Sequence, residues 1–442
     1  MCVRLKLWYA KSKNQINMTK FIAVSIILLF IVWVVDVRHP LLKENIPEFL
    51  LLPTDVSKTF LSTLSGVFLT VTTFTFATIL TVLGGYSSNF TPRVVQKFID
   101  KPYVLSLIGI FIGGFFYTIL SLFFLQGIDT EKTILAGTIG VLYGVTSMSY
   151  FVFFMQRVLR DMKGSHLIQD IYEEALILVE EEARQRKESE RLAEDKISVG
   201  IRIYSNKTGY LFGIDFERLF ALLKDLRGEL IIDKKIGEYI STGVYIARLH
   251  LLESPGYSQE EEKDLLKEIA GCFLYSDQKN ETYDYHHEIT NLVEIALRGL
   301  SPGINDPNTA INCIRKISIL IGKLFSTENH FIIARQNGKM KVIYTSYTVK
   351  EELYLAFYQI LHYGKEDPSV AAAILEGLTM IFMISDPAAE SGVGEYFSYA
   401  YEVVKKSMRE RMDAERIEQL RENFLRRREE LADKDAMREE ED

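Results

Sequence analysis

The sequence predicts an α-helical membrane domain with four transmembrane helices, followed by a cytoplasmic α+β domain. Four long uncharged runs stand within the first 156 residues, and no run of comparable length follows them. Charge is unevenly distributed: residues 1–154 contain 12 Lys/Arg and 7 Asp/Glu, whereas residues 155–442 contain 39 and 52. Beyond residue 195, short alternating segments typical of strands interrupt the helical patterns. An apolar, basic front and an acidic, charged back are typical of a membrane protein with a water-soluble body.

The uncharged runs define the membrane domain, which we expect over residues 20–156 after a basic cytoplasmic leader, residues 1–19. The runs contain 15, 34, 27 and 24 residues, and a helix needs about 20 apolar residues to cross a bilayer. The first run also resembles a secretory signal peptide, but no small-x-small cleavage site follows it. The expected spans are therefore about 20–37, 60–84, 103–125 and 134–154.

Basic residues in the short loops predict the orientation of these spans. The leader, the loop after the second span and the segment after the fourth contain 11 Lys/Arg, against 4 in the intervening loops. Because Lys and Arg are retained on the cytoplasmic side, both termini are expected there, in a multi-pass protein of the cell membrane. Cys2, Cys272 and Cys313 are too few and too far apart for a disulfide framework, which favours a reducing compartment.

Glycines in the third and fourth spans predict close helix packing. Gly109 and Gly113, and likewise Gly140 and Gly144, stand four residues apart. Such pairs let helix backbones approach closely in lipid, where no hydrophobic force drives helices together. The packing could lie within one subunit or between subunits.

Small and hydroxyl-bearing residues recur at helical spacing along the second span. They form one stripe, consisting of Thr59, Thr63, Gly66, Thr70, Thr73, Ala77 and Thr81. The stripe could be a tight packing seam with its hydroxyls bonded to the preceding turn. It could instead line a polar pathway in an oligomer. No ionisable residue lies deep within any expected span, which argues against ion-coupled transport.

The remaining chain is expected to form several cytoplasmic parts. A charged connecting helix is predicted over 157–195 and a small α+β module with about four short strands over 196–253. Residues 254–432 are expected to be mainly helical, with a short hairpin near 329–347 around Asn337-Gly338. The last helix is predicted over 389–432 as a solvated helix, and residues 433–442 as a disordered tail.

A sharp corner is predicted where Ser301-Pro-Gly-Ile-Asn-Asp-Pro307 interrupts the helical pattern. Asp306 suits an N-cap and Pro307 the first helical position. A helix N-terminus can also hold an anion. The corner is therefore either a capped turn or a site for an anion or partner, formed by Ser301, Asn305, Asp306, Asn308 and Thr309.

The sequence contains no recognisable motif for catalysis or cofactor binding. The sequence has neither a phosphate-binding loop nor a dinucleotide-binding glycine pattern. His287-Glu288 begins like a zinc-protease motif, but Asn291 stands where the second histidine is required. We expect no cofactor, no metal site and no enzymatic activity. The acidic body offers no basic field for nucleic acid.

The segment Glu294-Ile-Ala-Leu-Arg-Gly-Leu-Ser-Pro-Gly-Ile-Asn-Asp-Pro-Asn-Thr-Ala310 resembles the signature of a bacterial family of membrane proteins catalogued as a domain of unknown function. That signature reads roughly I-A-x-R-A-L-S-P-G-I-N-D-P-x-T-A. Gly299 stands where the family usually has Ala, and Asn308 where an aromatic residue is common. Ser88-Asn-Phe-Thr-Pro-Arg93 and Lys207-Thr-Gly-Tyr210 are similar to two further family segments. The resemblance covers about residues 20–400, and implies four spans and a cytoplasmic domain without a known activity.

Two functions remain compatible with the sequence. The first is an oligomeric passive channel or pore lined by the second span, with the cytoplasmic domain as gate or sensor. The second is a membrane-anchored binding or scaffolding module whose spans only tether it. In both, the expected partners are the lipid bilayer and further copies of the chain.

Overall fold

The computed structural model describes residues 2–89, 101–129, 132–161, 164–189, 200–253, 256–277, 284–327, 331–336 and 340–441. The chain divides into two compact units, Met1–Leu167 and Ile168–Asp442, which we call the membrane domain and the body. The described residues contain four helices long and apolar enough to cross a membrane. The fold class expected from the sequence, a four-helix membrane domain followed by an α+β domain, is confirmed.

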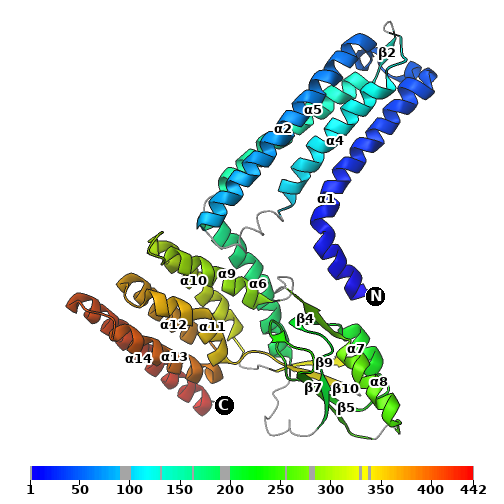
Figure 1. The fold of residues 1–442 in the computed structure, drawn as a ribbon. Coiled ribbons are helices and arrows are strands. Elements are labelled where there is room, and N and C mark those ends of the chain that lie inside the picture. Colours follow the sequence, from blue (N-terminus) through cyan, green and yellow to red (C-terminus); the bar gives the residue numbers. More distant parts are fainter. Residues whose placement is uncertain are drawn as a thin grey trace. The chain divides into compact units, whose positions relative to one another are not determined.

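Long helices run side by side in the membrane domain (Figure 1). They are α1 (Cys2–Trp33), α2 (Thr54–Asn89), α4 (Pro102–Phe124) and α5 (Ala136–Asp161). Their membrane-compatible parts are Met18–Arg38, Thr54–Gly85, Pro102–Phe124 and Ala136–Arg160. α4 is the most buried of the four and contacts each of the others. It is therefore the centre of the domain.

One end of the membrane domain is closed by short elements. α1 continues into a π-helical turn, η1 (Val34–Arg38), which is followed by the 3₁₀ turns η2 (Pro40–Asn45) and η3 (Glu48–Leu50). Strand β1 (Leu52–Pro53) pairs antiparallel with β2 (Thr133–Ile134). The hydroxyl of Tyr117 donates to the backbone oxygen of Ala136 at 2.9 Å. These bonds fix the start of α5 against its neighbours.

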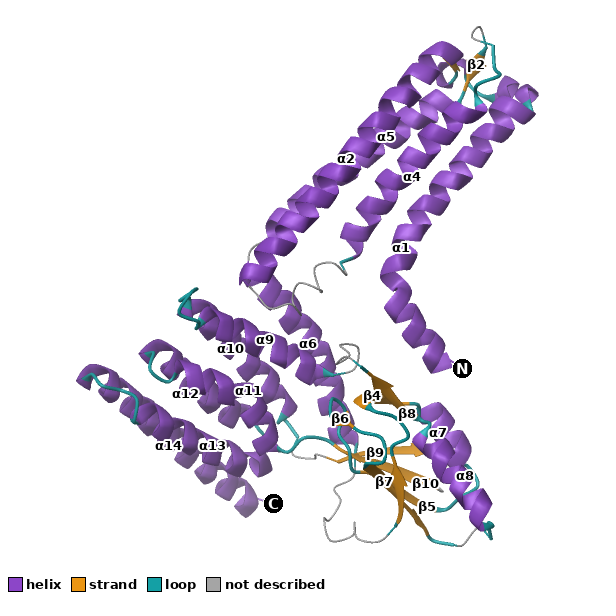
Figure 2. Cartoon of the chain, in the orientation of Figure 1, coloured by secondary structure: helices purple, strands orange, loops and turns teal. Residues whose placement is uncertain are grey.

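The described residues of the body form two sheets, whose strands are orange in Figure 2. The five-stranded sheet has the order β3-β7-β5-β10-β9, in which β5 and β10 are parallel and the other pairs antiparallel. The three-stranded sheet has the order β6-β4-β8. The strands are β3 (Ile201–Tyr204), β4 (Gly209–Ile214), β5 (Gly228–Ile232), β6 (Tyr239–Ile240), β7 (Tyr245–Leu251), β8 (Phe273–Ser276), β9 (Phe331–Gln336) and β10 (Met340–Thr345).

Helices complete the body. α6 (Gly164–Glu188) enters it, and α7 (Phe216–Leu223) and α8 (Gln259–Ala270) contribute Leu219, Leu223 and Ile269 to the core beneath the sheet. The others are α9 (Tyr285–Gly299), α10 (Pro307–Leu324), α11 (Val349–Gly364), α12 (Pro368–Ile384), α13 (Pro387–Lys405) and α14 (Arg411–Glu441). Phe397 of α13 stacks on Phe424 of α14 with ring centroids 3.8 Å apart. Aromatic packing therefore joins the last helices.

The body differs from the sequence-based expectation in three places. The strand pair expected near 329–347 is present as β9 and β10, which pair antiparallel, but β10 also pairs with β5 and so extends the sheet of the α+β module. β8 is a strand in a stretch expected to be helical, since Phe273 is buried in the core beside β4. The helix expected over 389–432 is two helices. No glycine or proline stands between Lys405 and Arg411, so neither of these helix-breaking residues explains the break.

The expected segments at the two ends of the chain also differ from the structure. α1 already begins at Cys2, within the expected leader, and α14 extends to Glu441, through the expected disordered tail. The connecting helix over 157–195 corresponds to the end of α5 and to α6, which ends at Glu188. The turn at Asn337-Gly338 lies outside the described residues.

Candidate functional site

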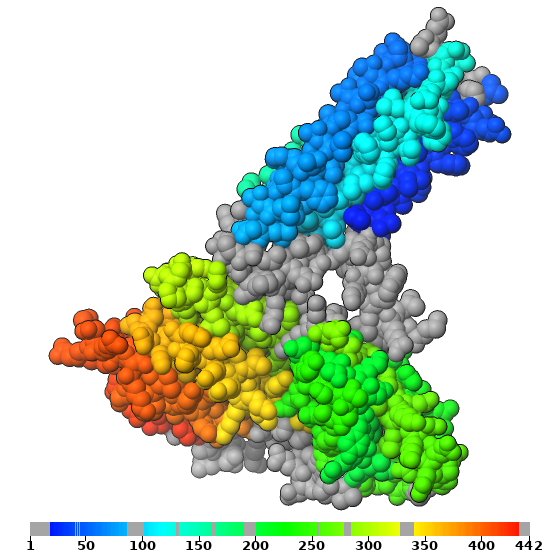
Figure 3. Space-filling view, in the orientation of Figure 1, coloured from blue at the N-terminus to red at the C-terminus, as the bar shows by residue number. Residues whose placement is uncertain are grey.

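The stripe on α2 faces away from the other helices of its own chain. All seven of its residues, from Thr59 to Thr81, are exposed. Thr63 and Thr70 stand two residues after the buried Leu61 and Phe68, which is about 200° around the helix. The stripe is therefore on the side opposite the packed face. The surface of α2 (blue) is open along its length in the space-filling view (Figure 3).

The threonine hydroxyls of the stripe are bonded to their own helix. Each donates to the backbone oxygen four residues earlier, at 2.8–3.1 Å, from Thr59, Thr63, Thr70, Thr73 and Thr81. The hydroxyl proton is thereby used, while the oxygen lone pairs remain available on the outer face. The stripe presents a column of hydrogen-bond acceptors.

Large apolar side chains flank the stripe on both sides. Val67 and Phe74 follow one edge, and Leu69, Phe76 and Leu80 follow the other, all of them exposed in the single chain. A narrow polar band between two apolar rows resembles a helix face that packs against neighbouring helices at its edges. A face that contacts only lipid requires no such band.

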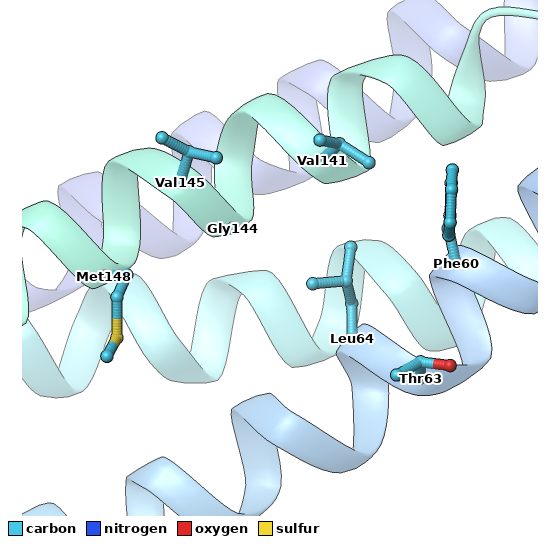
Figure 4. Close-up of a pocket in the computed structure, with 7 residues that line it drawn as sticks. All are labelled: Phe60, Thr63, Leu64, Val141, Gly144, Val145 and Met148. Atoms are coloured by element: carbon cyan, nitrogen blue, oxygen red, sulfur yellow. The ribbon is translucent and has the colours of Figure 1, made fainter.

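An apolar groove of about 320 Å³ lies between α2 and α5, next to the stripe. It is lined by Phe60, Thr63, Leu64, Val141, Gly144, Val145 and Met148 (Figure 4). Thr63 is the one stripe residue in this lining. Because the other side chains are apolar, the groove is a packing surface between two helices rather than part of a polar pathway.

The four glycines of the third and fourth spans lie at helix contacts within the chain. A Cβ atom at Gly109 would stand 2.6 Å from the backbone oxygen of Met18, and one at Gly113 2.3 Å from Oγ of Ser25. These two therefore face α1. Gly140 and Gly144 face α2, since their Cβ atoms would stand 2.8 and 3.0 Å from side-chain carbons of Leu61 and Leu64. The two glycine pairs do not face each other.

The corner between α9 and α10 is held by its own hydrogen bonds. Asp306 is the N-cap of α10 and accepts from the backbone nitrogen and the hydroxyl of Thr309, while Pro307 occupies the first turn. Ser301 donates to the backbone oxygen of Arg298. Asn305 has a φ of 50°, and Asn308 is exposed. The groups expected to bind an anion are those that build the turn.

A cluster of buried polar side chains in the body was missed in the sequence. It joins Glu182 and Arg186 of α6, Asp284, Tyr285 and His286 at the start of α9, Ser346 after β10, and Glu352 of α11. Glu352 is 0% exposed, Arg186 2% and His286 3%. These segments are far apart in the sequence. Only the polar run Asp284-Tyr-His-His-Glu288 at the start of α9 gives a local signal of it.

The hydrogen bonds of this cluster connect three helices. His286 Nε2 lies 2.8 Å from Glu352 Oε2, and His286 Nδ1 lies 3.2 Å from Asp284 Oδ1. Arg186 donates to the Ser346 hydroxyl at 2.7 Å and to Glu352 Oε1 at 3.4 Å. The hydroxyl of Tyr285 also donates to Glu352 Oε1.

The environment of the cluster shifts the pKa values of its members. Burial alone would lower the pKa of His286, but the carboxylates of Glu352 and Asp284 raise it to about 9. Burial alone would raise the pKa of Glu352, but His286 and Arg186 hold it below its usual range. At neutral pH both groups are therefore charged and form a buried ion pair.

A metal site needs several ligating side chains close together. Among the described residues, no three His, Cys, Asp or Glu side chains form a group that could hold a metal ion. Cys272 and Cys313 are both buried, and burial raises the pKa of the Cys272 thiol to about 11. These cysteines fit packing positions in the core.

Comparison with known proteins gives the chain a family without a known activity. A family model described as "Predicted membrane protein (DUF2254)" matches residues 16–380. Uncharacterized protein Rv1290c of Mycobacterium tuberculosis and uncharacterized protein Mb1321c of Mycobacterium bovis are each 22% identical over 340 residues, which is 74% of this chain. The chain spans 62% of the length of these relatives. No solved structure matches it. With most of its length covered by that model, the chain belongs to the DUF2254 family of predicted membrane proteins.

Proposed function

We propose that the protein is an oligomeric passive channel or pore in the cell membrane, with α2 lining the pathway and the body acting as gate or sensor. One observation carries the proposal: the threonine stripe of α2 is exposed in the single chain, opposite the packed face. In a cyclic oligomer, α2 of each copy can turn this stripe toward the symmetry axis.

The flanking side chains support such an assembly. Rows containing Phe74 on one side and Leu80 on the other would then pack between neighbouring copies. The threonine oxygens, whose protons are bonded to the helix, would face the axis as acceptors for water or for a permeating solute. The oligomer thus gives both kinds of exposed residue a partner.

The charge pattern of α2 supports passive rather than coupled transport. No Asp, Glu, Lys, Arg or His occurs from Thr59 to Pro92. Pumps and ion-coupled transporters use ionisable residues within their spans to bind and release protons or ions. A stripe of neutral hydroxyls suits diffusion down a gradient, and the proposal assigns no catalytic step to the protein.

Ion or solute flux across reconstituted bilayers tests the proposal. We expect conductance from the native protein and its loss in the double variant Thr70→Leu/Thr73→Leu. Each copy would then turn two bulky leucine side chains toward the symmetry axis, and together they would block the pathway. Thr146→Leu/Ser149→Leu on α5 is the matched control, since it replaces two exposed hydroxyls bonded to their own helix with the same side chain outside α2. All three proteins should unfold at the same temperature in detergent. A native protein without conductance would favour the alternative, a membrane-anchored binding or scaffolding module.

The proposed orientation places both termini and the body in the cytoplasm. It is supported by the 11 Lys/Arg in the segments on that side, against 4 on the other. A tag at the carboxyl end should resist protease in intact cells and be cleaved after the cells are opened. Cleavage in intact cells would contradict the orientation.

A further inference from the structure

We propose that the buried polar cluster of the body is a proton-operated latch, which holds α6 against α9 and α11 while His286 is protonated and releases α6 when that proton leaves. The cluster lies entirely within the body, so the inference does not depend on whether the membrane domain conducts.

Both nitrogens of the His286 ring lie close to acidic side chains. Nε2 lies 2.8 Å from a carboxylate oxygen of Glu352, and Nδ1 lies 3.2 Å from a carboxylate oxygen of Asp284. An ionised carboxylate can only accept hydrogen bonds, and a neutral imidazole has one donor and one acceptor nitrogen. Both contacts are hydrogen bonds only when the ring carries two protons. A neutral ring would turn a lone pair toward one of the carboxylates.

The same carboxyl group ties His286 to α6. Glu352 offers Oε2 to His286 and Oε1 to Arg186 and Tyr285. Arg186 also pairs with Glu182, one turn earlier in α6, at 3.0 Å. Loss of the His286 charge would leave Arg186 as the remaining cation beside Glu352. The contact between α6 and α11 would weaken in consequence.

The charged and titratable groups around His286 and its neighbour Tyr347 come from five segments. They are Asp284 and Tyr285 of α9, Glu351 and Glu352 of α11, Tyr347 after β10, Glu182 and Arg186 of α6, and Lys235 and Glu238 between β5 and β6. Acidic groups outnumber basic ones in this set. The proton on His286 therefore reduces an excess of negative charge.

The half-buried Tyr347 and Lys235 and the exposed Glu351 separate the latch from solvent. The Tyr347 ring lies 4.1 Å from the His286 ring, and Lys235 Nζ lies 4.6 Å above Tyr347. Lys235 pairs with Glu351 at 2.5 Å, and the side chain of Glu351 is 47% exposed. Movement of this surface ion pair would open a short route for a proton to His286.

The ionic composition of the cluster itself favours a switch over a purely structural role. Buried ion pairs are often no more stable than apolar side chains of the same volume, because both charges lose their hydration. Removal of only one partner of such a pair nevertheless strongly destabilises the fold, because the other charge stays buried without compensation. A site built in this way has two well-separated states, which a single proton can interconvert.

The pH range of the latch follows from the shift of His286. Its pKa rises from an ordinary value near 6.5 to about 9 in the folded body. Protonated His286 therefore stabilises the closed latch fully below the ordinary pKa of histidine. This stabilisation is lost as the pH rises through the pKa that His286 has in the folded body. The equilibrium constant for opening should therefore increase about tenfold per pH unit between pH 6.5 and 9, and level off above.

Hydrogen–deuterium exchange of the full chain in lipid nanodiscs tests the latch. We expect the protection of peptides covering residues 181–189 to fall between pH 6.5 and 9, after correction for base-catalysed exchange. Peptides from α12, whose buried side chains are apolar, serve as the internal reference and should keep their protection. Constant protection of α6 over this range would overturn the proposal, and so would an equal loss in α12, which would indicate global unfolding.

Three variants identify the group that titrates. His286→Gln should expose residues 181–189 to exchange at every pH, and the equilibrium constant for opening should no longer change tenfold per pH unit. The triple variant Arg186→Met/His286→Phe/Glu352→Leu should keep them protected at every pH, because an apolar cluster has no proton to lose. His362→Gln, an exposed histidine of α11, should behave like the native protein. A native-like pH dependence in His286→Gln would contradict the assignment.

Discussion

Asp36 caps a helix that begins a hundred residues later in the chain. Its carboxylate accepts hydrogen bonds from the backbone nitrogens of Leu135 and Ala136, at 2.9–3.0 Å, at the start of α5. Lys43 lies 3.2 Å from the same carboxylate, which is fully buried. The first and fourth spans are thus joined by a charge at the end of a helix, where unpaired N–H groups attract anions.

Replacement of Asp36 by Asn should destabilise the membrane domain. The variant leaves Lys43 without its counter-charge and weakens the cap of α5, so we expect a loss of about 2–4 kcal/mol in unfolding free energy. Thermal unfolding in detergent measures it. Asp129→Asn is the control, because Asp129 is 77% exposed and pairs with an exposed Lys132. Equal midpoints for the two variants would contradict the role given to Asp36.

Alanine at glycine positions should separate packing within the chain from contacts between chains. Gly109→Ala forces a Cβ atom against the backbone of Met18, so we expect a loss of about 1–3 kcal/mol. Gly66→Ala meets no atom within 4 Å in the single chain and should leave its unfolding temperature unchanged. Thermal scans of both variants in detergent check this. A Gly66→Ala variant as unstable as Gly109→Ala would place Gly66 in the packed core of the domain.

The corner at Asp306 offers a test between a capped turn and an anion site. Asp306→Ala removes an N-cap, and we expect a loss of about 1 kcal/mol in unfolding free energy. Asn305→Gly should be close to neutral, because glycine adopts a φ of 50° without strain. Thermal scans with added phosphate complete the test. A stabilisation by phosphate that is present in the native protein and absent in Asp306→Ala would favour the anion site.

The sequence predicted those parts of the fold that depend on local patterns. Uncharged runs located the four spans, since membrane insertion depends on the average polarity of about 20 consecutive residues. The start of α10 was equally local, because Asp306 and Pro307 determine it with their own backbone. The threonine stripe was visible as a spacing, but its exposure depends on which face of α2 packs against α4 and α5.

Features built from distant segments could not be predicted. Leu230 of β5 and Val342 of β10 are register partners more than a hundred residues apart, so the parallel pair leaves no local signal. The latch likewise requires Arg186, His286 and Glu352 to converge. Each of these residues is unremarkable in its own helix. The role of His286 could not be predicted, because its carboxylate partner in α11 cannot be identified from spacing.

Water accessibility along α2 tests the central claim, that the exposed stripe lines a pathway. Single cysteines at Thr63, Thr70 and Thr73, and at Phe74 and Leu80 for comparison, would be introduced after Cys2, Cys272 and Cys313 are replaced by alanine. A water-soluble thiol reagent would then be applied to the protein in lipid vesicles. We expect modification at the three threonine positions and protection at Phe74 and Leu80. Protection at all five positions, or equal modification of the stripe and its flanks, would contradict the account.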